Sequence, residues 1–261
     1  MHVLAVTPHN RLEPETLRAL FTQTYAGSLS HVFMRDNPEP EAGQNIIRAY
    51  RRLREIFLGG PYDALWIVEN DVIPPPQALD KLLAVDADIA YGVYCFRRGK
   101  PVVNIMHPAS RNTITDSPQA WAAGVRTGAV IDCGGLGFGC TLIHRRVLER
   151  LEFRTDGGGG DADSCLAADA PRAGFTQQAH LGVLCGHKRP DGVTIWPIGR
   201  RPFHETIGIS QPKLAGVRAR RSFAYWGDGG ATLIVPEGET ALIDFEIAAS
   251  LVAAGQAEYA A

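Results

Sequence analysis

Two acidic residues follow directly on a short apolar run in the first third of the chain. The run, residues 64–68 (ALWIV), is typical of a buried strand, and Glu69 and Asp71 come after it, one residue apart. Carboxylates spaced in this way can converge on one hard cation, and Mg²⁺ or Mn²⁺ held there can bridge a diphosphate. Taken alone, such a pair more often marks a solvated turn. The apolar strand before it and the prolines at 74–76 favour a fixed cation site.

A histidine ends another apolar run, in VLCGH at residues 183–187. A neutral imidazole suits Mn²⁺ or Zn²⁺, so His187 is a candidate further ligand. A buried histidine with ordinary hydrogen-bond partners is an equally good interpretation. Cys185 does not make a zinc site with it, because no second Cys/His pair has suitable spacing.

A third acidic group follows four consecutive glycines at 157–160. Such a run predicts a mobile lid, and a carboxylate beside a lid can act as a general base when the lid closes. Asp161 and Asp163 are both candidates for that base. Asp163 could also simply cap the helix that SCLAADA predicts, and the two roles are compatible.

Glycines recur at 134, 135, 137 and 139 without forming a dinucleotide-binding fingerprint or a P-loop. They predict either a tight turn with close backbone packing or the glycine-lined floor of a substrate site.

The elements that must position these groups alternate along the first part of the chain. Strand patterns alternate with helical patterns, which predicts an α/β fold with a mostly parallel sheet covered by helices on both faces. The strand patterns are 2–6, 29–34, 64–68 and 88–94, and the helical patterns are 13–25, 44–58 and 75–85. Ligands bind beyond the carboxyl ends of such strands. The residues at those ends are Thr7, Asp36, Glu69 and Asp71.

The whole chain sets few further limits. It has 261 residues and a net charge of −2, so no overall field attracts nucleic acid or acidic membranes. No apolar run approaches the roughly 18 residues of a membrane span, and the N-terminus lacks the pattern of a signal peptide. Five scattered cysteines predict reduced, mostly buried thiols, and with them a cytoplasmic protein.

The end of the chain changes character near residue 200. Residues 201–230 are rich in arginine and show little periodicity, which predicts a basic connecting segment. Residues 231–261 predict a small appendage of strand, Glu-Gly turn, strand and helix, with the helix ending at Gly255. We therefore expect a main domain at 1–200, a connector at 201–230 and an appendage at 231–261.

The motifs of residues 1–200 resemble, in order, those of a GT-A glycosyltransferase of the broad family-2-like kind. Asp36 matches the acid that reads the nucleotide base in that family. Glu69 departs from the usual first aspartate of the D-x-D motif, and Gly160 replaces the usual glutamate of the acidic motif. The matching segments are TPHNR (7–11), WIVENDV (66–72), the stretch from GGLGFG (134–153), GGDADSCLAADAPRAGF (159–175) and VLCGH (183–187).

This resemblance implies a metal-dependent transfer of sugar from a nucleotide-diphosphate sugar, a UDP- or GDP-sugar, to an unspecified acceptor hydroxyl. It implies Mn²⁺ or Mg²⁺ held by Asp71, Glu69 and His187, and a catalytic base at Asp161 or Asp163. The implied acceptor contacts are Gly135, Gly137 and Phe138. The implied nucleotide contacts are Thr7, Pro8, Arg11, Asp36, Asn45, Glu69 and Asn70.

Two other functions remain open from the sequence. The C-terminal tail resembles small modules of phage proteins, which favours a phage or prophage origin and leaves a non-catalytic phage accessory protein as one alternative. A nucleotidyltransferase is the other, because it also uses paired acids on an α/β sheet. That class would ordinarily carry a glycine-rich basic loop near the N-terminus, and TPHNRLEP (7–14) is a poor one.

Overall fold

The computed structural model describes most of the chain. The described residues are 1–9, 11–35, 42–96, 103, 105, 124–125, 127–156, 161–197, 214–226, 232–244, 248, 251–252 and 254–260. Among them, no helix is both long and apolar enough to cross a membrane. The five cysteines are buried free thiols, as expected.

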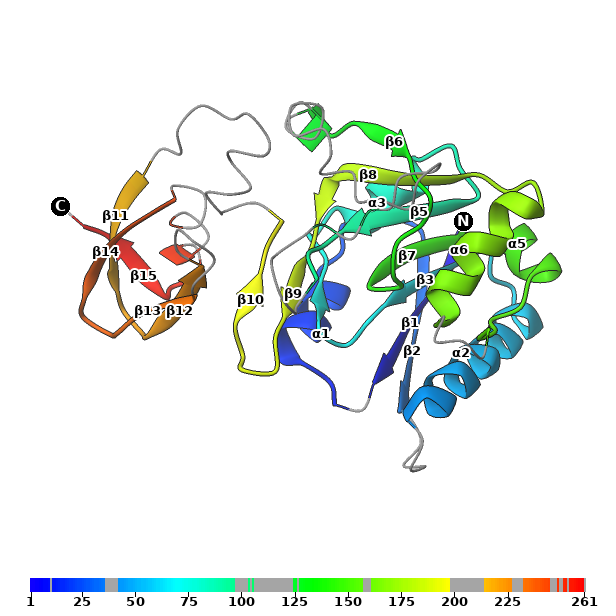
Figure 1. Ribbon diagram of the computed structural model, residues 1–261, viewed down its shortest axis with the longest axis horizontal. Helices are drawn as coiled ribbons and strands as arrows, with labels where there is room; N and C mark the ends of the chain where they lie inside the picture. Colours follow the sequence, from blue (N-terminus) through cyan, green and yellow to red (C-terminus); the bar gives the residue numbers. More distant parts are fainter. Residues whose placement is uncertain are drawn as a thin grey trace.

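A seven-stranded sheet forms the centre of the main domain (Figure 1). Its order is β2-β1-β3-β7-β5-β8-β6. Strands β1, β2, β3, β5 and β8 run in one direction, and β6 and β7 run in the other. The bounds are β1 His2–His9, β2 Ser28–Arg35, β3 Ala64–Val68, β5 Ile89–Val93, β6 Val130–Asp132, β7 Cys140–His144 and β8 Gln177–Leu184.

Helices cover both faces of this sheet, and each face has its own apolar core. Alternate residues of a strand point to opposite faces, so Trp66 of β3 packs with Leu20 and Leu79 while Ile67 packs with Leu53 and Leu166. The first face carries α1 (Pro14–Phe21) and α3 (Ala78–Leu83). The second carries α2 (Ala42–Gly59), α5 (Arg145–Arg150) and α6 (Ala162–Arg172). This arrangement is the α/β fold that the sequence predicted, a mostly parallel sheet covered by helices on both faces.

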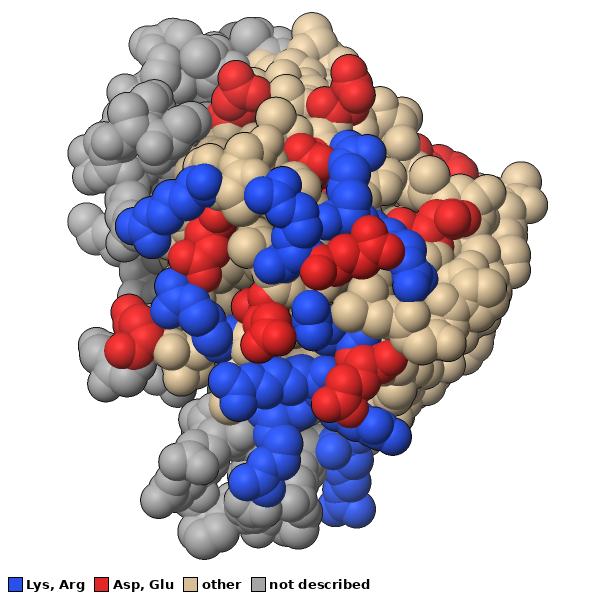
Figure 2. Space-filling view, turned by 90° about the vertical axis from the view of Figure 1, so that its right-hand side faces the viewer, with Lys and Arg blue, Asp and Glu red and all other residues tan. Residues whose placement is uncertain are grey.

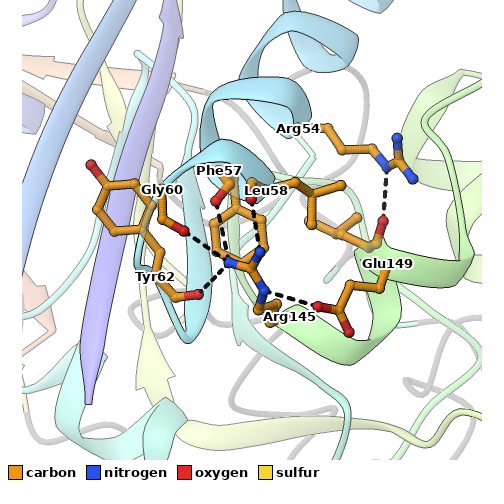
Figure 3. A network of polar contacts seen from close by, with 8 residues as sticks. Arg54, Phe57, Leu58, Gly60, Tyr62, Arg145 and Glu149 are labelled. Carbon is orange, nitrogen blue, oxygen red and sulfur yellow. Dashed lines mark hydrogen bonds and ion pairs between the residues drawn. The ribbon is translucent and has the colours of Figure 1, made fainter.

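The end of α2 is held by one arginine from the start of α5 (Figure 3). The last carbonyls of a helix have no partner within the helix. Arg145 donates hydrogen bonds to the carbonyls of Leu58, Gly60 and Tyr62, at 2.8, 3.0 and 3.1 Å, and pairs with Glu149 at 2.9 Å. These contacts fix α2 against the strand that precedes α5.

Charged side chains are interleaved on the face that α2 and α5 cover (Figure 2). Some of the ion pairs there lie within one helix and others join separate segments, so opposite charges lie next to each other and produce no field of one sign. The pairs are Arg52–Glu55, Arg145–Glu149, Arg146–Asp88 and Arg154–Asp169.

A second, three-stranded sheet lies beyond the end of β3. Its order is β10-β9-β4, with β4 Val72–Ile73, β9 Gly186–Lys188 and β10 Thr194–Ile195. Strand β4 follows the acidic turn directly, and it pairs with the strand that contains His187. This small sheet therefore connects two distant parts of the sequence at the candidate site.

The C-terminal strands lie at one end of the molecule (Figure 1) and pair differently from our expectation. The turn between β13 (Thr232–Val235) and β14 (Thr240–Asp244) exists, but the two strands do not pair with each other. Strand β14 pairs with β11 (Leu214–Ala219), and β13 pairs with β12 (Phe223–Trp226). The expected helix has helical residues at 248 and 251–252, and β15 (Ala257–Tyr259) follows and pairs with β11.

The segment 201–230 is therefore not only a connector, because β11 and β12 lie within it. Strand β11 was missed because LAGVRA has only a short alternation, with buried Val217 and Ala219 on either side of exposed Arg218. Three residues of alternation are too few to predict a strand.

Candidate functional site

The acidic turn brings Asp71 next to His187. The turn after β3 is closed by a hydrogen bond from the Val72 N–H to the Glu69 carbonyl, at 3.0 Å. Val72 then pairs with His187 across β4 and β9, and the Lys188 N–H donates to the Asp71 carbonyl at 2.7 Å. As a result, Oδ2 of Asp71 lies 3.6 Å from Nε2 of His187, and both side chains are largely shielded from solvent.

The hydrogen bond of the other ring nitrogen fixes the chemistry of this pair. Nδ1 of His187 lies 2.7 Å from the carbonyl oxygen of Cys95. A carbonyl oxygen only accepts, so Nδ1 carries a hydrogen, and in the neutral form of the ring Nε2 has the lone pair that can bind a cation. A backbone partner on the far nitrogen is the usual arrangement of a metal-binding histidine. At 3.6 Å, Nε2 of His187 and Oδ2 of Asp71 are too far apart for a hydrogen bond but close enough to bind one cation between them.

Glu69 does not join Asp71 and His187 as a third neighbouring ligand. No group of three or more His, Cys, Asp or Glu side chains that could hold a metal occurs in the described part of the chain. Glu69 instead accepts a hydrogen bond from Tyr50 of α2, at 3.4 Å from Oε1. The extra methylene of glutamate lets the carboxylate reach α2, so any contact of Glu69 with a cation held by Asp71 and His187 would be indirect, as the departure from the usual aspartate suggested.

The second acidic group lies at the start of α6. Asp161 is the N-cap residue, although its side chain makes no capping hydrogen bond, and it is exposed. Asp163 lies in the first turn, and its Oδ1 accepts the Ser164 N–H at 2.6 Å. Asp163 is therefore not the helix cap, as one of our two interpretations had it.

The environment of Asp163 makes its carboxylate more basic. Burial raises the pKa of Asp163, and the nearby charge of Asp161 raises it further, while the hydrogen bonds from Ser164 act in the opposite direction. A carboxylate with a raised pKa is better suited to take a proton from a hydroxyl group. This favours Asp163 over Asp161 as the candidate base.

The glycines at 134, 135, 137 and 139 lie beside Asp163, but only some of them border the site. A Cβ on Gly137 would lie 3.0 Å from Oδ2 of Asp163. Gly135 has φ +117° and packs on Ala167 of α6, where a Cβ would come within 2.3 Å of another carbon. Phe138 is 1% exposed and packs against Tyr50, with ring centroids 5.0 Å apart.

Two of the three expected acceptor contacts are therefore core positions. Phe138 faces the interior because the strand that follows it starts at Cys140 and alternates its side chains between the two apolar cores. Gly135 is buried under α6. Gly137 is half-buried and stays a candidate.

The expected nucleotide side is partly described. Thr7 and Pro8 are buried at the end of β1, and Oγ1 of Thr7 has no hydrogen-bond partner among the described residues. Asn70 donates from Nδ2 to the carbonyl of Arg11 at 2.6 Å, which ties the acidic turn to the loop after β1. The Arg11 side chain is exposed and lies 3.3 Å from Glu13. Asp36, the side chain of Asn45 and the glycines at 157–160 lie outside the described residues.

Sequence analysis did not identify two side chains that matter here. Tyr94 directly follows β5 and lies between the two acidic groups. The edge of one ring faces the other in its contact with His187, with the ring centroids 5.2 Å apart. The Tyr94 hydroxyl accepts a hydrogen bond from the Gly139 N–H at 3.1 Å. Lys188 lies 2.8 Å from both Glu13 and Glu15, at the start of α1. Each is an ordinary residue of a strand pattern, and only the pairing of distant segments reveals its position.

Comparisons with known proteins identify no family for the chain. No family model matches, and no curated protein matches. Among solved structures, A197 from STIV is 17% identical, with a TM-score of 0.49, covering 75% of this chain and 93% of A197. S. aureus TarS 1–349 in complex with UDP is 10% identical, with a TM-score of 0.43, covering 70% of this chain and 58% of TarS. TarS 1–349 in complex with UDP-GlcNAc gives the same identity and TM-score, with 56% of TarS covered.

Proposed function

We propose that this protein is a glycosyltransferase that moves a sugar from a nucleotide-diphosphate sugar to an acceptor hydroxyl group. The observation that carries the proposal is that two acidic groups, one after β3 and one in the first turn of α6, both lie near Tyr94. Asp71 faces His187 on one side of Tyr94, and Asp163 faces Gly137 on the other. The motif resemblance of residues 1–200 supports the same function.

The Asp71–His187 pair is the place where Mn²⁺ or Mg²⁺ would be held. Such a cation would supply positive charge to the leaving diphosphate. The chain itself contributes the carboxylate of Asp71 and the lone pair of His187 Nε2, whose direction is set by the Cys95 carbonyl. Thr7 and Pro8 would line the nucleoside pocket, together with Asp36, the residue that follows β2 in the sequence.

Asp163 would act as the base. In a single displacement with inversion, the acceptor oxygen bonds to the anomeric carbon as the bond to the diphosphate oxygen breaks, and the hydroxyl proton passes to Asp163. Burial, which raises the pKa of this carboxyl group, increases its affinity for that proton. Gly137, which is half-buried and has no side chain, lies beside Oδ2 of Asp163 and would be the acceptor contact there.

The test is a thermal-shift and calorimetric screen of UDP- and GDP-sugars, with and without Mn²⁺, on the parent and two variants. Asp71→Asn removes the proposed cation ligand, and Asp86→Asn removes a carboxylate from an exposed surface position as a matched control. We expect one nucleotide class to stabilise the parent and the control in the presence of Mn²⁺, and much less so the Asp71 variant.

Each outcome separates the proposal from its alternatives. Donor hydrolysis or transfer supports the glycosyltransferase. Nucleotide binding without turnover under any acceptor supports a non-catalytic binding protein. Release of pyrophosphate from a nucleoside triphosphate and a sugar phosphate supports a nucleotidyltransferase. If no nucleotide stabilises the parent, the proposal fails.

A further inference from the structure

Tyr94 occupies a slot that two glycines keep open. It follows β5 near the middle of the main sheet, and it is 5% exposed. A Cβ on Gly137 would lie 2.4 Å from its hydroxyl oxygen, and a Cβ on Gly139 would lie 2.5 Å from its ring. Any larger residue at either glycine would displace the tyrosine, so the glycine run and Tyr94 fit each other.

On the side of the proposed cation site, the ring of Tyr94 contacts the ring of His187. The planes of Tyr94 and His187 are at 89°, with centroids 5.2 Å apart, so the tyrosine ring restricts the rotation of the imidazole. The Cys95 carbonyl fixes one ring nitrogen, and the aromatic contact fixes the tilt of the ring. Together these contacts direct Nε2 toward Asp71.

On the side of the proposed base, the hydroxyl of Tyr94 contacts the Gly137–Gly139 segment. It accepts the Gly139 N–H at 3.1 Å, which holds the glycine run in place. Tyr94 Oη and Asp163 Oδ2 both face Gly137, which has no side chain to separate them.

A second tyrosine of the same strand shows what an ordinary core tyrosine looks like here. Tyr91 is fully buried, and its hydroxyl donates to Oε1 of Gln177 at 2.7 Å. That bond points toward α6 and away from the Asp71–His187 pair. Tyr94 differs because it contacts a glycine, an imidazole and the surroundings of both acidic groups.

We propose that Tyr94 is a positioning residue with two separable parts: its ring orients His187 for cation binding, and its hydroxyl orients the Gly137–Gly139 segment and Asp163 for transfer. The second part rests on the proposed glycosyltransferase function, whereas the first part requires only that the Asp71–His187 pair binds a cation.

The test uses Tyr94→Phe, which keeps the ring and removes the hydroxyl, and Tyr94→Leu, which removes both. Tyr25→Phe is the matched control, because the Tyr25 hydroxyl binds the Met1 carbonyl away from the site. Mn²⁺ alone is titrated calorimetrically into each full-length protein, and the kcat and KM of transfer are measured with the donor found for the parent. Thermal melts establish that each variant is folded.

We expect the phenylalanine variant to bind Mn²⁺ within about 2-fold of the parent while kcat falls about 10-fold at unchanged donor KM. The leucine variant should also lose about 10-fold in Mn²⁺ affinity, as is typical for residues that orient a metal ligand. A leucine variant that binds Mn²⁺ like the parent overturns the ring assignment, and a phenylalanine variant with the parent's kcat overturns the hydroxyl assignment.

The failure of the function and the failure of this inference give different results. If the parent binds Mn²⁺ but transfers no sugar, the glycosyltransferase proposal fails, and the Mn²⁺ affinities of the two variants still decide the role of the ring. A parent that binds no Mn²⁺ overturns the ring assignment directly.

Discussion

Two aspartates lie on opposite sides of Tyr94, and the fold supports them in different ways. Asp71 follows a strand, and the backbone on both sides of it is paired: its carbonyl accepts the Lys188 N–H, and the next residue belongs to β4. Asp163 lies in the first turn of a helix, where its carboxylate accepts hydrogen bonds from the adjacent Ser164. The first side is fixed by main-chain pairing and the second by the placement of α6.

The placement of α6 depends on two linked hydrogen bonds, which join Tyr91 to Gln177 and Gln177 to the Ala167 carbonyl of the helix. Pro171 lies inside the helix and has no N–H, so the Ala167 carbonyl loses its usual partner four residues later. Gln177 fills this gap, because its Nε2 donates to the Ala167 carbonyl at 2.9 Å. The Tyr91 hydroxyl then donates to Oε1 of the same glutamine at 2.7 Å. We therefore expect side-chain changes to affect the Asp163 side more than the Asp71 side.

The largest expected effect is on the reaction itself. Asp163→Asn removes the proposed base and should lower kcat by about 100-fold to 10,000-fold, the usual contribution of a general base. The donor affinity in the presence of Mn²⁺ should stay near that of the parent, since Asp71 and His187 are unchanged. If kcat stays within 10-fold of the parent, the base is elsewhere and the two sides do not divide the chemistry as we propose.

The same variant should be more stable than the parent at neutral pH. Burial raises the pKa of Asp163, so the folded protein holds this proton more tightly than the unfolded chain, and ionisation at higher pH costs stability. Asparagine removes that cost but can still accept the Ser164 N–H. Melting curves should show a higher Tm for the variant at pH 7, and the difference should disappear below about pH 4, where aspartate is protonated in both states.

The second prediction concerns the cation side. Asp71→Asn should weaken Mn²⁺-dependent donor binding by about 10-fold to 100-fold, by analogy with changes around metal ligands. Glu69→Gln should have a milder effect, since Glu69 contacts Tyr50 and does not contribute to a three-residue ligand cluster. Donor affinity measured against Mn²⁺ concentration decides the matter. Equal losses in the two variants would show that both carboxylates act on the cation directly.

The sequence predicted the sheet and the acidic positions but not their mutual arrangement. Asp71 and Asp163 were candidates because each follows a local signal in the sequence, an apolar run that forms β3 or a run of glycines. Tyr94 and Gln177 carry no such signal, since their roles depend on the pairing of β5 with β7 and β8. Phe138 was misplaced because a motif match does not reveal which face of the chain is buried.

The third prediction tests the hydrogen bonds that Gln177 makes to the Ala167 carbonyl and the Tyr91 hydroxyl. Gln177→Met leaves the Ala167 carbonyl and the Tyr91 hydroxyl without partners in the core, which should cost about 1–3 kcal/mol of unfolding free energy. In a Pro171→Ala background the restored N–H of residue 171 can bond to the Ala167 carbonyl, so the same change should cost less. Chemical denaturation of the two single variants and the double variant measures this coupling.

The kcat and the Mn²⁺ affinity of the Gln177 variant test whether the Asp71 side and the Asp163 side are supported separately. Gln177→Met should lower kcat, because Asp163 moves with α6, and should leave Mn²⁺ affinity within about 2-fold of the parent. An equal loss of Mn²⁺ affinity would show that the two sides of Tyr94 are supported by one common structure, contrary to our interpretation.

The smallest effect is expected at Lys188, the side-chain support of the Asp71 side. Burial opposes the charge of Lys188, but hydrogen bonds to Glu13 and Glu15 outweigh it and raise its pKa. The raised pKa means that the ion pairs stabilise the fold up to high pH and are lost as the pH rises through the pKa of the folded state. Lys188→Met leaves Glu13, which is 13% exposed, without this partner, and should cost about 1 kcal/mol of unfolding free energy.

The cation site itself should tolerate the loss of Lys188. The Lys188 N–H still bonds to the Asp71 carbonyl in the methionine variant, and β4 still pairs with β9, because both contacts are made by the backbone. Mn²⁺ affinity should therefore fall by no more than about 3-fold, a small effect beside that of losing a group that orients a metal ligand. Glu15→Gln is the control, since it weakens the same cluster from its half-exposed partner. If Lys188→Met lost Mn²⁺ binding as completely as Asp71→Asn, the Asp71 side would depend on side chains as the Asp163 side does, and the distinction between the two would be lost.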